Sequence, residues 1–260
     1  MNHLQSDNRD NDKSQSPWGE AGPPVESPQP QVRPSGGEPA FNVPGALVVI
    51  ALACIAIHFL RTQVFGPMTN VSIILNYALI PERFTVGFVL TDLTLWLSLV
   101  SHTLLHGDWL HLAFNLIWLV AFGAPVAYRL GTFRTLAFWV ITALGAAALH
   151  MALYWGDPVP LIGASGAVSG FLGAAARFGF RRNRAARTGF TQPLLPPMLA
   201  LRQRGVVPFL ALWMVMNYAS GAGWFGAPSN IAWEAHIGGL ITGFFLIGLV
   251  DPGPAARAVT

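Results

Sequence analysis

The sequence predicts an all-α membrane protein, built as a bundle of six transmembrane helices. Of its 260 residues, 53% are hydrophobic and only 10% are charged, and the mean hydropathy is +0.48. Soluble domains usually carry about 25% charged residues, so the composition favours a membrane protein. Several apolar stretches also approach or exceed the roughly 18 residues that a membrane-spanning helix needs.

The apolar stretches define the domain organisation. Residues 1–40 are polar and have few apolar side chains with which to build a hydrophobic core, so we expect a disordered cytoplasmic tail. Residues 41–250 form the predicted six-helix domain, and residues 251–260 a short cytoplasmic tail. The expected spans are residues 44–60, 109–128, 135–155, 163–180, 206–220 and 235–250. Residues 61–100 are semi-apolar and interrupted by prolines and charges, which predicts short interfacial helices.

Arginine placement predicts the orientation. The loop between the fourth and fifth spans holds six arginines: Arg181, Arg182, Arg184, Arg187, Arg202 and Arg204. Residues 154–162 and 221–234 contain neither lysine nor arginine. Because positive loops stay in the cytoplasm, both termini and the arginine-rich loop are expected there. The basic balance therefore reflects topology, and we expect no nucleic acid partner.

A serine flanked by glycines opens the fourth span, in the run Gly163-Ala164-Ser165-Gly166. Serine becomes a nucleophile when a neighbouring base takes its proton. The unpaired N–H groups at a helix N-terminus can bind the oxyanion that forms when serine attacks a carbonyl. Small residues also serve helix packing alone, so the serine needs a partner to indicate catalysis.

His236, at the start of the last span, is the candidate partner of Ser165. Ionisable residues at membrane depth are scarce and usually functional. Gly239 and Gly243 follow it with a spacing that lets helices approach closely. Such an approach would permit a Ser–His hydrogen bond of about 2.6–3.2 Å. We therefore predict Ser165 as nucleophile and His236 as general base.

A third group of polar residues precedes and opens the second span. His111 and Asn115 are four residues apart, share a helix face and can both donate hydrogen bonds while neutral. With the Ser165 backbone N–H, they would form an oxyanion hole. His102 and His106 have a spacing also found in metal sites. No cysteine or acidic cluster completes a metal shell, so we predict structural hydrogen bonds there and no metal or other cofactor.

The three motifs together resemble the rhomboid family of intramembrane serine proteases. The resemblance covers roughly residues 41–250 and implies a six-helix rhomboid-like bundle with a Ser165–His236 dyad. It implies His111, Asn115 and the Ser165 backbone as oxyanion donors. It also implies structural support from a wider set: Gly163, Gly166, His102, His106, Gly239 and Gly243.

The sequence departs from some relatives at one position of this site. They carry an aromatic residue four positions after the nucleophile, stacked under the base, whereas this chain has Ser169. The His236 ring then needs another support, and glycine-face packing or the Ser169 hydroxyl are the candidates. Glu234 is two residues from His236 and would face elsewhere on a helix, so we do not expect it to form a triad.

The resemblance implies an intramembrane endopeptidase that cleaves in or near transmembrane segments of other membrane proteins. An inactive rhomboid-like protein that binds such clients is the alternative, although both dyad residues are present. A transporter would be expected to show inverted repeats, and the sequence has no internal repeat. In the outer loop, Trp224 and Phe225 suit either a mobile cap or interfacial anchoring.

The expected location is the lipid bilayer, as a multi-pass protein. The outer loops carry no targeting signal, and we expect a bacterial inner membrane. The sequence specifies no oligomeric state and no particular substrate.

Overall fold

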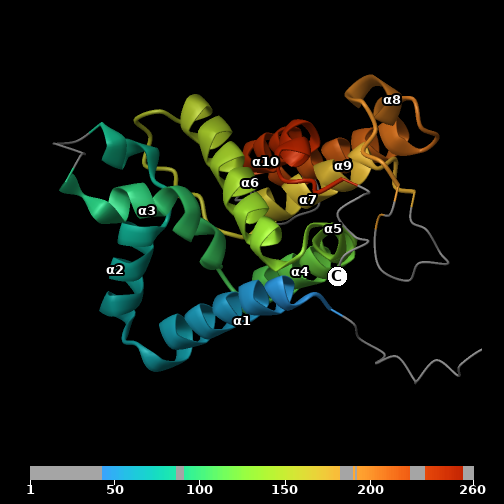
Figure 1. Cartoon of the computed structure of the whole chain (residues 1–260). Helices are drawn as coiled ribbons and strands as arrows, with labels where there is room; N and C mark the ends of the chain where they lie inside the picture. The colour runs from blue at the N-terminus through green and yellow to red at the C-terminus, as the bar shows by residue number, and fades with distance from the viewer. Residues whose placement is uncertain (1–42, 86–90, 182–189, 191, 223–231, 254–260) are drawn as a thin grey trace, which may run out of the picture. The chain divides into compact units, whose positions relative to one another are not determined.

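A computed structural model describes most of the chain, as the ribbon in Figure 1 shows. The described residues are 43–85, 91–181, 190, 192–222 and 232–253. Within these ranges the secondary structure is helical, apart from one isolated bridge between Leu79 and Leu161. The prediction of an all-α chain is therefore confirmed for this part. The predicted N-terminal tail, Trp224 and Phe225 lie outside the described residues, as do residues 182–189 and 191 of the arginine-rich loop and most of the C-terminal tail.

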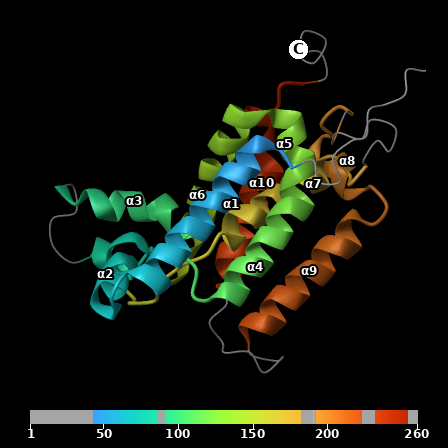
Figure 2. The ribbon, with the colours of Figure 1, turned by 90° about the horizontal axis from the view of Figure 1, so that it is seen from below.

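The first predicted span forms a helix that is longer than expected. α1 (Gly45–Phe59) continues into the π-helical turn η1 (Leu60–Val64), so the helix ends at Val64 instead of Leu60. The following segment contains the short helices that the sequence predicts. These are α2 (Pro67–Tyr77), η2 (Pro81–Phe84), α3 (Leu93–Ser101) and η4 (His102–Leu104). Figures 1 and 2 show α2 and α3 projecting to one side of the helices that follow.

Helices also occupy the five remaining predicted stretches. They are α4 (Trp109–Trp118), η5 (Leu119–Gly123) and α5 (Ala124–Leu130), then α6 (Thr132–Leu153), α7 (Ser165–Arg177), α9 (Val206–Gly221) and α10 (Trp233–Leu246) with η6 (Ile247–Leu249). A short helix α8 (Pro197–Leu201) precedes α9. Three helical stretches in the described part, residues 45–64, 109–130 and 132–153, are long and apolar enough to cross a membrane. The predicted count of six spans is thus not confirmed by length.

The shortness of α7 follows from its position at the centre of the bundle. All residues from Gly166 to Arg177 are buried, and the helix packs against α6 and α10. Figure 1 shows α7 next to α10 and α6. A helix enclosed by protein does not have to match the thickness of the hydrocarbon layer, so its 13 residues suffice.

Glycines bring the backbones of α7 and α10 into direct contact. A Cβ atom added at Gly239 would lie 2.8 Å from the carbonyl carbon of Gly166 and closer still to its oxygen. One turn further along, a Cβ at Gly243 would lie 2.5 Å from the carbonyl carbon of Gly170. Any side chain at these two positions would push the helices apart. Glycine at 239 and 243 therefore sets the distance between α7 and α10.

Two buried arginines, on α5 and α7, form hydrogen bonds near the C-terminal ends of α7 and α10. Arg129, at the end of α5, forms a buried ion pair with Asp251 and donates to the Gln192 carbonyl oxygen over 2.8 Å. Arg177, at the end of α7, donates to the Phe244 carbonyl oxygen over 2.7 Å. These bonds give the buried guanidinium groups partners for their charge, as burial requires.

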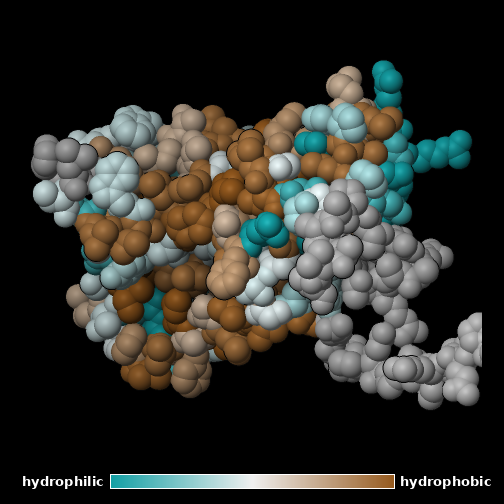
Figure 3. All heavy atoms as spheres, viewed as in Figure 1, coloured by the Kyte–Doolittle hydropathy of each residue, from teal (hydrophilic) through white to brown (hydrophobic). Residues whose placement is uncertain are grey.

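The outward surface of the bundle is apolar. Figure 3 shows hydrophobic residues over much of one face, and large side chains on several helices are exposed. Val49 on α1 is 58% exposed and Leu212 on α9 is 61% exposed. Exposed apolar area of this extent marks a surface that contacts something other than water. Together with the three long apolar helices, it identifies an integral membrane protein.

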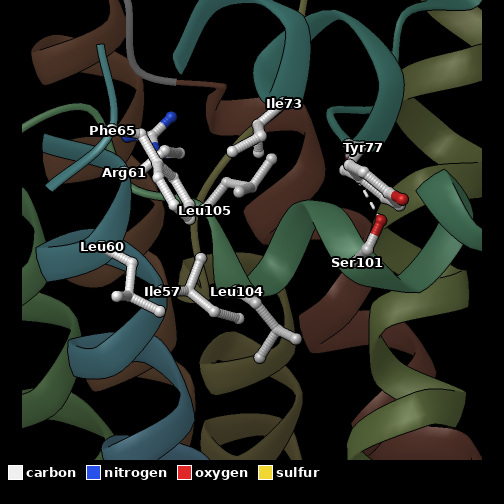
Figure 4. Close-up of a pocket in the computed structure, with 9 residues that line it drawn as sticks. All are labelled: Ile57, Leu60, Arg61, Phe65, Ile73, Tyr77, Ser101, Leu104 and Leu105. Carbon is white, nitrogen blue, oxygen red and sulfur yellow. Dashed lines mark hydrogen bonds between the residues drawn. The ribbon is translucent and has the colours of Figure 1, made fainter. Parts of the chain in front are cut away.

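An apolar pocket of about 340 Å³ lies beside the projecting helices. Figure 4 shows its lining, which comes from α1, η1, α2 and the segment from α3 to the residues after η4. At the edge of the pocket, the Ser101 hydroxyl donates a 2.8 Å hydrogen bond to the Tyr77 carbonyl oxygen. None of the predicted site residues lines this pocket, so it is separate from the candidate active site.

Candidate active site

Ser165 is the first residue of α7, at the end where helix N–H groups are unpaired. No side chain caps this helix terminus. Gly163, two residues earlier, has φ = +120°, a conformation that residues with a Cβ rarely adopt. A Cβ there would also lie only 2.9 Å from His111 Nε2. Position 163 therefore requires glycine both for its backbone conformation and for the space that His111 occupies.

The structure brings the Ser165 and His236 side chains together. The distance between Ser165 Oγ and His236 Nε2 is 2.7 Å, which is a hydrogen bond. Ser165 begins α7, and His236 lies in the first turn of α10. The close packing of α7 against α10 makes this short distance possible, because the glycine contacts hold the N-terminal turns of the two helices side by side.

The other ring nitrogen of His236 faces a residue that the sequence did not single out. His236 Nδ1 lies within hydrogen-bond reach of the Asn217 side-chain oxygen on α9. Ser169, one of the expected supports, instead donates to the Ser165 carbonyl oxygen over 2.7 Å. The one available signal for Asn217 was an amide within an otherwise apolar segment, and that signal does not reveal which way the side chain points.

His111 lies on the other side of Ser165. Its Nδ1 accepts a 3.4 Å hydrogen bond from the Gly107 backbone N–H, so its Nε2 carries the proton. The space beside Gly163 that a Cβ would fill is 2.9 Å from His111 Nε2 and 3.6 Å from Ser165 Oγ. A donor and a hydroxyl thus border the same small space, which is the arrangement that an oxyanion hole requires.

Asn115 is buried in the next turn of α4, at 4% exposure. Its side-chain Nδ2 donates to the His111 carbonyl oxygen over 2.9 Å, while its Oδ1 is buried without a hydrogen-bond partner. An amide nitrogen carries two protons, so one proton remains for a second acceptor. Asn115 therefore supports the backbone of His111 and keeps a donor of its own.

His102 and His106 bind the backbone at the junction before α7. The His102 carbonyl oxygen accepts from the Gly163 N–H over 2.9 Å, and its ring Nδ1 lies 2.9 Å from the Ser98 carbonyl oxygen. His106 Nε2 accepts from the Ala164 N–H over 3.4 Å. The bonds from the Gly163 and Ala164 N–H groups hold the peptide that leads into Ser165.

The buried histidine on α6, His150, was missed by the sequence reasoning. His150 Nδ1 on α6 lies 2.8 Å from Glu234 Oε1 on α10, and its Nε2 lies 3.1 Å from the Val159 carbonyl oxygen. Both ring nitrogens of His150 therefore lie within hydrogen-bond distance of an oxygen atom, one on α10 and one in the segment between α6 and α7. Glu234 thus joins α10 to α6.

These features define a class: a helical integral membrane protein with a serine and a histidine hydrogen-bonded at the start of two closely packed helices. A family model described as the Rhomboid domain matches residues 94–251. The chain belongs to the rhomboid family, and the membership predicted from its motifs is confirmed.

Curated relatives carry the same family name. The chain is 30% identical over 164 residues to "Rhomboid protease GlpG" of Yersinia pestis (strain Pestoides F), which covers 62% of this chain and 50% of the relative. It is 32% identical over 151 residues to the protein of that name from Yersinia enterocolitica serotype O:8 / biotype 1B, covering 56% of this chain and 45% of the relative. The chain spans about half the length of these curated relatives.

Proposed function

We propose that this protein is an intramembrane serine endopeptidase that hydrolyses peptide bonds in or near transmembrane segments of other membrane proteins. The hydrogen bond between Ser165 Oγ and His236 Nε2 carries the proposal. A serine is activated when a base can take its proton at this distance. Membership of the rhomboid family and relatives named as proteases support the same activity.

In the proposed reaction, Ser165 Oγ attacks the substrate carbonyl carbon while its proton passes to His236 Nε2. The carbonyl oxygen becomes an oxyanion, stabilised by the Ser165 N–H, by His111 Nε2–H and by the free Asn115 Nδ2 proton. The carbon–nitrogen bond then breaks, and His236 returns the proton to the leaving amine. Water repeats the sequence on the acyl-enzyme: His236 takes its proton, its oxygen bonds to the carbonyl carbon, and Ser165 leaves with the proton.

The substrate must present an extended peptide bond. A helix hides its carbonyl groups in hydrogen bonds, so a substrate helix has to unwind locally before Ser165 can attack. Small or helix-breaking residues near the cut would facilitate this step. The substrate class is therefore a membrane-protein segment that unwinds near the membrane surface.

The proposed topology has six spans, with both termini in the cytoplasm and the site on the outer side. Ser165 opens α7 and Arg177 closes it, which separates them by about 18 Å along the helix axis at 1.5 Å per residue. Arg177 is thus at the opposite end of α7 from the dyad, which supports an outward-facing site under the positive-inside rule. Residues 1–40 and 251–260 would be cytoplasmic tails on a domain of residues 41–250.

The test is proteolysis of a tagged transmembrane substrate by purified protein in detergent. We expect cleavage by the wild type and none by Ser165→Ala or His236→Ala. A fluorophosphonate should label the wild type and fail to label Ser165→Ala. Cleavage that persists in Ser165→Ala would overturn the assignment. Substrate binding without cleavage in all variants would instead favour an inactive client-binding protein.

A further inference from the structure

Asn217 connects the candidate base to a helix that otherwise carries no part of the site. It lies in α9, and its side-chain oxygen faces His236 Nδ1. His236 Nε2 faces Ser165 Oγ at 2.7 Å. The imidazole ring is therefore held at both nitrogens, by a hydroxyl on α7 and by an amide on α9.

The orientation of the Asn217 amide is fixed by a second bond. Its Nδ2 donates a 2.8 Å hydrogen bond to the Trp213 carbonyl oxygen, one turn earlier in α9. An amide nitrogen can only donate, so this bond leaves Oδ1 as the atom that faces His236. Because Oδ1 can only accept, His236 Nδ1 must be the ring nitrogen that carries the proton.

We propose that Asn217 is a positioning residue for catalysis, which holds His236 in the tautomer whose Nε2 lone pair faces Ser165. The inference rests on the proposed function and deepens it. A neutral histidine has one protonated nitrogen, and the opposite tautomer would point an N–H at the serine and could not accept its proton. When His236 takes the proton from Ser165, the Nδ1–H bond to Asn217 remains and steadies the imidazolium.

The contacts of α9 give this bond a further consequence. Val206 and Ala219 are its buried residues, and most of its other side chains face outward or are partly exposed. Its links to α10 include the Asn217–His236 bond and an edge-to-face contact between Tyr218 and Trp233 at 5.7 Å. A displacement of α9 would therefore remove the partner of His236 Nδ1. The base is competent when α9 is docked.

The experiment compares three variants of the full chain in detergent. Asn217→Leu has similar size and no acceptor, whereas Asn217→Asp keeps an oxygen acceptor at the same place. Val215→Ala, at an exposed position of α9, is the matched control. Thermal unfolding midpoints are measured for all three, together with kcat and KM on the transmembrane substrate. The His236 tautomer is read by ¹⁵N NMR of histidine-labelled protein.

We expect Asn217→Leu to lower kcat by about 10- to 100-fold with KM unchanged, since misplacing a reacting group by about 1 Å can cost about 100-fold. Asn217→Asp should recover most of kcat, and Val215→Ala should match the wild type. The NMR spectrum of Asn217→Leu should show His236 protonated at Nε2 in part of the population, against Nδ1 alone in the wild type.

Three results would overturn the proposal: wild-type kcat in Asn217→Leu, an equal loss of kcat in both Asn217 variants, or an unchanged tautomer in Asn217→Leu. The NMR measurement needs no turnover, so it decides the positioning role even if the protein hydrolyses nothing. Activity that survives in Ser165→Ala would instead overturn the proposed function. The two failures are thus distinguishable.

Discussion

His106 is a buried histidine whose neutral form holds the peptide before Ser165. Its Nε2 accepts the Ala164 N–H, which only an unprotonated nitrogen can do. The residue lies between η4 and α4, fully buried. Burial lowers the pKa of His106 to about 3, and electrostatic interactions with His111, His58 and Arg61 act in the same direction. The folded protein therefore keeps this ring neutral well below pH 6.5.

The same shift makes stability depend on pH. Between pH 6.5 and about 3, His106 stays neutral in the folded state and becomes protonated in the unfolded chain. Its contribution to the free energy of unfolding is fully present above pH 6.5 and is lost as pH falls through this window. The expected slope is about 1.4 kcal/mol per pH unit. Unfolding midpoints at pH 7, 6 and 5 should fall more steeply for the wild type than for His106→Gln. Parallel slopes would contradict the assignment.

Sequence reasoning could anticipate a Ser165–His236 contact, because glycines follow both residues at spacings suited to close packing. It could not anticipate Asn217. The apolar side chains of α9 surround the helix, so the sequence gives no indication of which face turns inward. The His150–Glu234 pair escaped for a similar reason: the two residues are 84 positions apart, and their contact depends on the crossing of α6 and α10.

At the scale of elements, the packing of α7 against α10 determines the distance between Ser165 and His236. Neither helix is held by large interlocking side chains at this crossing, since the backbone of Gly239 lies directly against that of Gly166. Small residues are typical of such membrane-helix contacts, where dispersion and close approach replace the hydrophobic effect. The contact is therefore sensitive to mutation, because there is no space even for the methyl group of an alanine at Gly239.

We therefore expect Gly239→Ala to lower the free energy of unfolding by about 1–3 kcal/mol, the usual range for overpacking. It should also lower protease activity, since separating the helices lengthens the Ser165–His236 distance. Differential scanning fluorimetry and the cleavage assay would measure both effects. Gly248→Ala is the control, because a Cβ there meets Leu194 at an ordinary 3.5 Å. Equal stability of the two variants would contradict this account of the crossing.

The positions of the predicted spans correspond to helices, but their lengths could not be predicted. Hydropathy marks where the chain is apolar, and it does not distinguish lipid contact from burial in protein. α7 illustrates this: residues 163–180 look like a span in the sequence, whereas the helix has 13 residues and an almost entirely buried surface. Its glycines and alanines report the proximity of neighbouring helices more than the thickness of a bilayer.

At the scale of the whole molecule, the two ends of the bundle differ in chemistry. One end holds Ser165, His236 and their hydrogen-bond partners. The other end holds Arg129 and Arg177, whose guanidinium groups bind Asp251 and backbone carbonyl oxygens. If the positive-inside rule governs insertion, the arginine end faces the cytoplasm and substrates reach the serine from the outer side.

This orientation can be tested by cysteine labelling in intact cells. The native Cys54 is buried and would be replaced by alanine to give a cysteine-free background. Asp157→Cys, exposed between α6 and α7 at the dyad end, should react with a membrane-impermeant maleimide added outside. Arg202→Cys, exposed after α8 at the arginine end, should react only after the membrane is opened. Protection of residue 157 together with labelling of residue 202 would mean that the site opens to the cytoplasm. Substrates would then have to unwind at the inner surface, and the proposed route of substrate entry would be reversed.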